Sequence, residues 1–256
     1  GGLSGLAWDR RTDMLVAISD RGAVFRMPRT PDGPPSLIGR IRPPKGASDP
    51  EALRRTKEGR WLVAFEAGGA IAAYRGGADA LAQPPEATLS PKAWRTLPTN
   101  AAIEAIAILD FGRLLAIAEG GSGPSRKAWI VDGDQLAERA YPVSDGFLPV
   151  DAVGLPNGDV LVLERRFNGP LPPFFSARLA RLAATDLAAD SGDIAIAARK
   201  DLVGILPGEN WEGVEIVVEE DKAEVWFVSD DNFRWPQHTL LAKLPLGVVT
   251  AMLAAP

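Results

Sequence analysis

The stretch Glu104-Ala105-Ile106-Ala107-Ile108 decides the fold, because four other segments repeat its pattern of a small or acidic residue followed by a short apolar strand. These segments are Ser4-Gly5-Leu6-Ala7-Trp8, Glu51-Ala52-Leu53, Asp151-Ala152-Val153-Gly154-Leu155 and Glu212-Gly213-Val214-Glu215-Ile216. The five segments recur about every 50 residues, a period typical of β-propeller blades.

A turn signal and a second strand follow the repeated segments. The turns include Lys57-Glu58-Gly59-Arg60, Asp110-Phe111-Gly112-Arg113 and Pro156-Asn157-Gly158-Asp159. Gly and Asn supply the positive φ angles that tight hairpins need. The second strands are expected at 14–19, 61–65, 114–118, 160–163 and 225–229. These runs are short and apolar, which suits strands buried on both faces.

Outer strands complete each unit. Third and fourth strands are expected at 23–27 and 36–41, 70–74 and 87–89, 128–131 and 137–142, 178–182 and 194–198, and 239–244 and 248–253. The Ala-rich stretch 183–189 could instead form short helical turns. Four antiparallel strands per unit predict an all-β fold, a five-bladed β-propeller that forms one domain over residues 1–256. Six blades remain open if the long fourth repeat hides a blade or if preceding residues supply strands.

Composition narrows the classes of partner. The chain has 256 residues, 46% of them hydrophobic, a net charge of -5 and no cysteine. Its Lys and Arg residues are scattered, which argues against a nucleic-acid partner. No apolar run is long enough for a transmembrane helix, and a disulfide-stapled scaffold is excluded. The start at Gly1-Gly2-Leu3 suggests a processed or trimmed product, and we expect a monomer.

Carboxylates occupy equivalent places in the repeats. In a propeller the first strand lines the central channel and the second runs antiparallel beside it, so the start of one and the end of the other share a face. First strands start with Ser4, Glu51, Glu104, Asp151 and Glu212, and second strands end with Asp20, Glu66, Glu119, Glu164 and Asp230. Asp49, Asp231, Asn100, Asn210 and Asn232 lie nearby in the sequence. We therefore expect nine carboxylates at one mouth of the channel.

A ring of acids indicates a divalent cation. Any single member could be a solvated strand end or the partner of an arginine, but so many like charges cannot all stay ionised without a cation or raised pKa values. Hard oxygen ligands suit Ca²⁺ or Mg²⁺ better than zinc. The predicted ligands are Glu51, Glu104, Asp151 and Glu212, with Glu104 and Glu212 also as catalytic groups.

Arginines adjoin the acids at three positions, Arg21, Arg165 and Arg166. They are expected either to neutralise the acid ring through ion pairs or to form a fork for an anionic substrate. A further motif, Gly120-Gly121-Ser122-Gly123, lacks the Gly-Lys-Ser/Thr ending of a phosphate loop, so a flexible surface loop is predicted there.

The chain also resembles a known family. The matching segments are 2–6, 19–22, 50–53, 103–105, 143–147, 163–167, 210–213 and 228–233. They are similar to the phytase-like domain family, also described as esterase-like activity of phytase. The resemblance implies a β-propeller, a periplasmic or secreted bacterial protein, and kinship with Ca²⁺-dependent propeller phytases. Such phytases have a lysine-rich phosphate cleft, which this sequence does not show.

Three functions follow as expectations. The first is a Ca²⁺-dependent hydrolase of phosphoesters or other esters, in which the ion activates water and a mouth carboxylate accepts the proton. The second is a non-catalytic binding propeller with a structural metal. The third is a lactonase-type propeller, for which Asn100, Asn210 and Asn232 would complement the acids.

Overall fold

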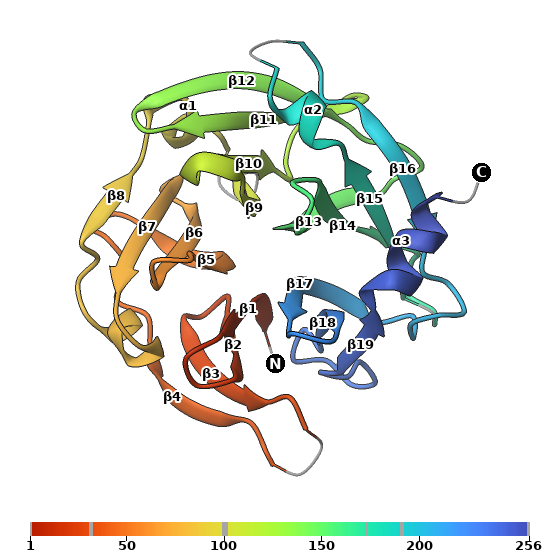
Figure 1. The fold of residues 1–256 in the computed structure, drawn as a ribbon, viewed down its shortest axis with the longest axis horizontal. Coiled ribbons are helices and arrows are strands. Elements are labelled where there is room, and N and C mark those ends of the chain that lie inside the picture. The colour runs from red at the N-terminus through yellow and green to blue at the C-terminus, as the bar shows by residue number, and fades with distance from the viewer. Residues whose placement is uncertain (1, 31–32, 99–101, 173, 190–191, 255–256) are drawn as a thin grey trace.

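The chain folds into a closed ring of five antiparallel sheets, a five-bladed β-propeller (Figure 1). This computed structural model describes residues 2–30, 33–98, 102–172, 174–189 and 192–254. Each blade is one sequence repeat, and its strands pair in the order in which they follow one another along the chain. The predicted fold class and the number of blades are confirmed.

The strands fall at the expected places. Blade 1 has β1 (Leu3–Asp9), β2 (Met14–Ser19), β3 (Ala23–Pro28) and β4 (Ser36–Arg40). Blade 2 has β5 (Ser48–Arg55), β6 (Arg60–Ala67), β7 (Ala70–Arg75) and β8 (Ala87–Leu89). Blade 3 has β9 (Ile103–Ile108), β10 (Leu114–Ala118), β11 (Ser125–Asp132) and β12 (Gln135–Pro142). Blade 4 has β13 (Leu148–Gly154), β14 (Val160–Phe167), β15 (Phe175–Leu182) and β16 (Ile196–Asp201).

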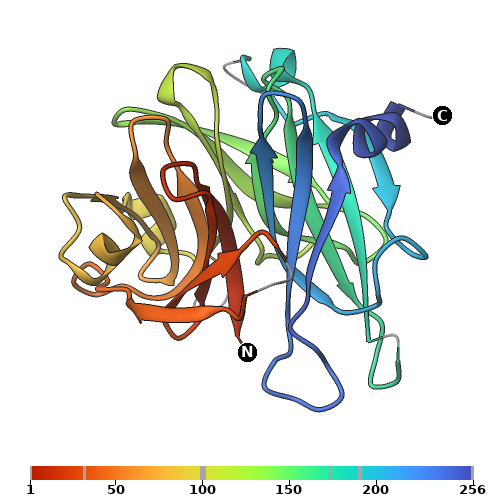
Figure 2. The same ribbon diagram turned by 60° about the horizontal axis from the view of Figure 1, so that its bottom comes forward.

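Blade 5 departs from the prediction. It has only β17 (Asn210–Val218), β18 (Ala223–Asp230) and β19 (Leu241–Pro245), and residues 248–253, expected as a fourth strand, lie in helix α3 (Leu246–Ala254). Val249 and Leu253 of this helix are buried in the apolar cluster between blades 4 and 5. Figure 2 shows α3 at the end of blade 5 opposite the long β18–β19 loop. The apolar run therefore covers a core as a helix and does not extend the sheet.

Short helices lie in some of the other connections. They are α1 (Lys92–Arg95), α2 (Ala184–Leu187) and the 3₁₀ turns Ala78–Ala82 and Asp110–Gly112. Helix α2 lies in the Ala-rich stretch for which a helical turn was the alternative expectation. Of the helices in the described part of the chain, none combines the length and the apolar character that crossing a bilayer requires.

The core lies between the blades. Five apolar clusters fill the five interfaces between neighbouring blades, including the one between blades 5 and 1 that closes the ring. At this closure Leu6 and Leu15 of blade 1 pack with Trp226 of blade 5. The innermost strands contact one another around the ring, with β1 touching both β5 and β17. Burial of apolar surface between blades thus fixes the ends of the innermost strands around one channel.

Candidate functional site

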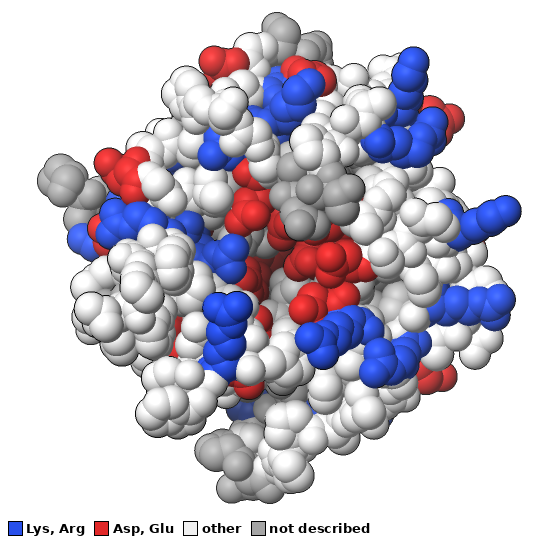
Figure 3. Space-filling view, turned by 180° about the vertical axis from the view of Figure 1, so that it is seen from behind, with Lys and Arg blue, Asp and Glu red and all other residues white. Residues whose placement is uncertain are grey.

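Acidic side chains gather at one mouth of the central channel. We call this feature the mouth pocket; its volume is about 230 Å³. It is lined by Gly2, Leu3, Ser4, Asp20, Glu51, Glu66, Glu104, Glu119, Arg165, Glu212, Asp230 and Asn232. Seven of these residues are carboxylates, and they come from blades 1, 2, 3 and 5. Figure 3 shows Asp and Glu side chains at the hollow centre of this face, with Lys and Arg farther out.

In blades 1, 2, 3 and 5, a β-bulge in the innermost strand turns the first residue of the repeated segment toward the mouth pocket. The pairing of β1, β5 and β17 with their neighbours skips one residue, which is Ser4, Glu51 and Glu212 respectively. In blade 3 the skipped residue is Glu104, between Ile103 and Ala105. A bulge leaves its extra residue out of the ladder and re-aims its side chain. The repeat therefore places Glu51, Glu104 and Glu212 at equivalent positions.

Blade 4 is the exception, because the bulged residue of its innermost strand is not an acid. Its bulge lies between Pro149 and Asp151, so the extra residue is Val150 and Asp151 is one step farther along. A shift of one residue turns a side chain to the other face of a strand. Asp151 is fully buried and accepts hydrogen bonds from the amides of Ala152 (2.9 Å) and Val214 (2.8 Å). The expected place of Asp151 in the acid ring is therefore corrected: it does not line the mouth pocket.

The acid at the end of the second strand of blade 4, Glu164, is also one residue out of register with the acids of the other blades. In the other blades, the residue paired just before the bulge, such as Ser19, Phe65 or Ser229, is followed by an acid that lines the mouth. In blade 4 the residue paired at this place is Glu164, opposite Pro149, so the next residue, Arg165, lies where the other blades have an acid. Glu164 is fully buried and interacts with Tyr141 (2.8 Å), Arg178 (2.5 Å) and Arg199 (3.1 Å). Its expected place at the mouth is corrected too, because the acid belongs to a buried ion-pair network.

Arg165 is the one Lys or Arg among the described residues that line the mouth pocket. Its guanidinium donates to Glu119 at 3.1 Å, to the side-chain oxygen of Asn210 at 2.7 Å and, at short range, to Glu212. Burial disfavours its charge, but the attraction of Glu212 and Glu119 nevertheless raises its pKa. This geometry matches the neutralising role that was one of the two expectations for the arginines.

The other two arginines stay outside the mouth pocket. The guanidinium of Arg21 lies 4.1 Å from the centre of the Phe233 ring. Arg166 donates to the carbonyl of Asp145 and to the side chain of Asn168, both at 3.2 Å. Asn232 lines the pocket, whereas Asn100 lies outside the described residues.

Most of the mouth acids hold protons more tightly than exposed acids do, because their pKa values are raised. Burial, followed by repulsion from neighbouring carboxylates, raises the pKa values of Glu51 and Glu104 well above 4.5. Burial also raises the pKa of Glu212 to about 7, although Arg165 opposes the shift. The pKa values of Asp20, Glu66 and Asp230 are raised as well, with burial as the first cause. Ionisation of all seven carboxyl groups would leave an excess of negative charge that Arg165 alone does not balance, and the raised pKa values reflect this repulsion and the burial.

Two features fit a hard cation. One oxygen each from Asp49, Glu51 and Glu66 lies within 4.8 Å of the others, so the three could share an ion. Oδ1 of Asp20 is buried and has no hydrogen-bond partner in the described part of the chain. A buried acceptor without a donor is costly unless something satisfies it. Carboxylate oxygens are ligands that Ca²⁺ and Mg²⁺ prefer.

Arg54 closes the channel beneath the acids. Its guanidinium donates to the carbonyls of Leu6 (2.8 Å), Ile106 (2.9 Å) and Ala152 (2.7 Å), and it forms an ion pair with Asp151. These partners come from the innermost strands of blades 1, 3 and 4. Arg54 was not among the site residues expected from the sequence, although a charged side chain directly after the apolar run of an innermost strand was a visible signal.

Known structures share the fold at low sequence identity. A protein of unknown function from Bacteroides caccae is 14% identical, with a TM-score of 0.53 over 95% of this chain and 77% of that one. A glucose dehydrogenase is 13% identical (TM-score 0.52; 95% and 97% covered), and a luciferin-regenerating enzyme is 11% identical (TM-score 0.51; 95% and 76% covered). At such identities these likenesses show the propeller fold alone.

Sequence comparison adds the family. No curated protein matches the chain. The model of the Phytase-like family, described as "Esterase-like activity of phytase", matches residues 1–233. This span contains all seven carboxylates of the mouth pocket and Arg165. The chain is therefore a member of the Phytase-like family.

Proposed function

We propose that the mouth pocket binds Ca²⁺, or another hard divalent cation, and that the chain is a metal-dependent hydrolase of phosphoesters or other esters. One observation carries the proposal: seven carboxylates converge in a pocket of about 230 Å³ that holds a single arginine. The proposed ligands are Glu51, Glu104 and Glu212 of the inner bulges, with Asp49, Glu66 and Asp20 beside them.

The protein groups supply proton transfer and orientation. When bound, the ion would polarise the ester and lower the pKa of a coordinated water. Glu212, whose pKa is about 7, can hold or release a proton near neutral pH, as a general base or acid must. Arg165 and Asn210 both donate hydrogen bonds to Oε1 of Glu212, which fixes the position of this oxygen. Glu104 is the second proposed acid–base group, because burial and four neighbouring carboxylates raise its pKa.

The decisive test is calorimetric titration of chelator-treated protein with Ca²⁺. We expect saturable binding to the wild type and its loss in Glu104→Gln and Glu212→Gln, which keep the shape of the side chain but remove its charge. Glu86→Gln is the matched control, because Glu86 pairs with Arg60 and Arg75 away from the mouth pocket. Absence of binding to the wild type, or unchanged binding in both mouth variants, would refute the metal site.

Turnover is tested separately from binding. The Ca²⁺-loaded protein is assayed on aryl phosphates, carboxylic esters and lactones, with Glu212→Gln as the inactive comparison. Hydrolysis of the first two classes supports the proposal. Binding of Ca²⁺ without turnover of any class would instead support a binding propeller with a structural metal.

A lactonase is the second candidate, and Asn232 is the observation that favours it. This residue lines the mouth pocket beside the acids, so the pocket offers an amide as well as carboxylates. Preferential turnover of lactones over aryl phosphates, reduced in Asn232→Ala, would establish this candidate in place of the first.

A further inference from the structure

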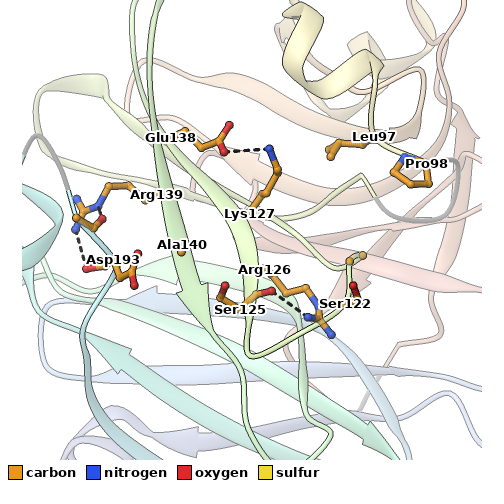
Figure 4. A pocket seen from close by; sticks show the side chains of 13 residues that line it. Leu97, Pro98, Ser122, Ser125, Arg126, Lys127, Glu138, Arg139, Ala140 and Asp193 are labelled. Carbon is orange, nitrogen blue, oxygen red and sulfur yellow. Dashed lines mark hydrogen bonds and ion pairs between the residues drawn. The ribbon is translucent and has the colours of Figure 1, made fainter.

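A second and larger pocket lies next to the mouth pocket on blade 3. Its volume is about 670 Å³, and it is lined by the Gly-rich loop at 120–122, the first residues of β11, part of β12 and residues 192–193 of blade 4 (Figure 4). Glu119, which lines the mouth pocket, directly precedes Gly120, which lines this one. We call it the loop pocket.

Arg126 is a cationic side chain of this pocket whose donors are not all paired in the described part of the chain. Its Nη1 donates to the carbonyls of Gly123 (3.2 Å) and Ser125 (3.0 Å), so its own loop holds one end of the guanidinium. Its Nε is buried and has no hydrogen-bond partner in the described part of the chain. Nε and Nη2 lie on the side of the guanidinium that binds carboxylates and phosphates through two parallel hydrogen bonds. The carbonyls therefore restrain one end of Arg126, and its buried Nε is a donor that no described group satisfies.

The other cations of the loop pocket are already paired. Lys127 contacts Glu138 at 3.0 Å, and both side chains are about half exposed. Arg139 is nearly fully buried and donates to the carbonyls of Ala189 (2.9 Å) and Gly192. Figure 4 shows these two groups on the far side of the pocket from Ser122 and Arg126. Arg126 is thus the group of this pocket best placed to recognise a ligand.

The loop backbone adds neutral donors. Within the described residues, the amides of Gly120, Gly121 and Ser122 have no backbone hydrogen-bond partner. Gly121 and Gly123 adopt φ angles of 122° and 96°, which side chains with a Cβ rarely reach. Successive amides in such turns form concave sites for anions.

We propose that the loop pocket binds an oxyanion, the phosphate or carboxylate group of a small molecule, with the guanidinium group of Arg126 as its principal contact. The amides of the Gly-rich loop and the hydroxyls of Ser122 and Ser125 complete the site. This site does not depend on a metal in the mouth pocket, because none of the mouth carboxylates lines it. The lack of a loop lysine distinguishes it from a nucleotide phosphate loop.

The test is calorimetric titration of chelator-treated protein with inorganic phosphate and, separately, with acetate. Chelation keeps the result independent of the proposed metal site. We expect saturable binding that Arg126→Gln weakens by about tenfold or more, because a charge-assisted bidentate contact is lost. Arg126→Lys keeps the charge without the guanidinium group and is expected to fall between the two. Arg75→Gln is the matched control, an exposed arginine paired with Glu86 on blade 2.

Each outcome decides the proposal. Stronger binding of phosphate than of acetate identifies the ligand group as a phosphate, and the reverse identifies a carboxylate. Circular dichroism and thermal unfolding of Arg126→Gln show whether the variant is folded, and Arg126→Lys gives an independent reading if it is not. The proposal is overturned if neither anion binds the wild type, or if folded Arg126→Gln binds both as well as the wild type does.

Discussion

Glu212→Gln should make the metal-free protein more stable at pH 8, even though it removes an ion pair. The wild-type carboxyl has a pKa of about 7 in the folded protein, against an ordinary value of 4.5. The folded state therefore binds more protons than the unfolded state between these two pH values. The stability that the neutral form provides is complete below pH 4.5 and is lost as the pH rises through 7.

The size of the effect follows from the pKa. One pKa unit corresponds to about 1.4 kcal/mol, so ionised Glu212 costs the folded state about 3 kcal/mol at pH 8. The Glu212 side chain is 16% exposed through the mouth, and solvent screening lowers the expected gain to about 2–3 kcal/mol. Gln resembles the neutral acid and can still accept the hydrogen bond from Asn210. At pH 5 the gain should be below about 1 kcal/mol.

Urea unfolding in the presence of chelator, at pH 5 and at pH 8, measures this gain. Glu86→Gln provides the control for loss of an acidic charge at the surface, and its stability relative to wild type should not rise with pH. Repeating the pH 8 measurement with Ca²⁺ should reverse the order, because only the wild type gains stability from the ion. A variant that is equally stable or less stable than wild type at pH 8 without metal would refute the electrostatic reasoning.

Three other predictions test the channel and the ring. The affinity of the wild type for Ca²⁺ should rise between pH 6 and 8, because the ion competes with protons on acids whose pKa values are raised. Binding should release protons, and calorimetric titrations in buffers of different ionisation enthalpy measure this release. Arg54→Met should cost about 3–5 kcal/mol of stability by leaving Asp151 buried without its partner, and adding Asp151→Asn should recover part of the loss in denaturant unfolding. Gly5→Ala should lower stability by about 1–3 kcal/mol, because the new Cβ would lie 2.8 Å from the amide nitrogen of Leu53; an unchanged unfolding midpoint would contradict the close packing of blades 1 and 2.

The five-bladed architecture could be predicted from the sequence because several sequence features repeat together. Apolar runs, turn residues and the spacing of about 50 residues all agreed on a blade of antiparallel strands. The C-terminal run was assigned wrongly because periodicity alone does not distinguish a strand from a helix in a short apolar segment. Helix α3 begins directly after Pro245 and packs on the interface between blades 4 and 5. This tertiary contact favours the helix, and it is not visible in the local sequence.

The site was harder to predict because a shift of one residue in the pairing of the first and second strands decides which side chains reach the mouth. Aligning the repeats by their acids placed Asp151 beside Glu51 and Glu104, whereas aligning them by their bulges places Val150 there. The sequence around the acid could not separate the two alignments, since both put an apolar strand after it. What separates them is the hydrogen-bonded pairing with the second strand, which shows that Arg165, and not Glu164, ends at the mouth.

This departure of blade 4 makes the mouth pocket asymmetric, and the asymmetry gives the proposed chemistry a direction. Arg165 is held by Glu119 and Glu212, which lie on the two neighbouring blades, so these acids are partly neutralised on the blade 4 side. The cluster of Asp49, Glu51 and Glu66 belongs to blade 2, which does not contribute to these contacts. A cation is attracted most to acids that no other cation already compensates. We therefore expect the blade 2 acids to be the strongest ligands of the metal, with Glu212 as the ligand at the opposite edge of the same site, where Arg165 partly neutralises it.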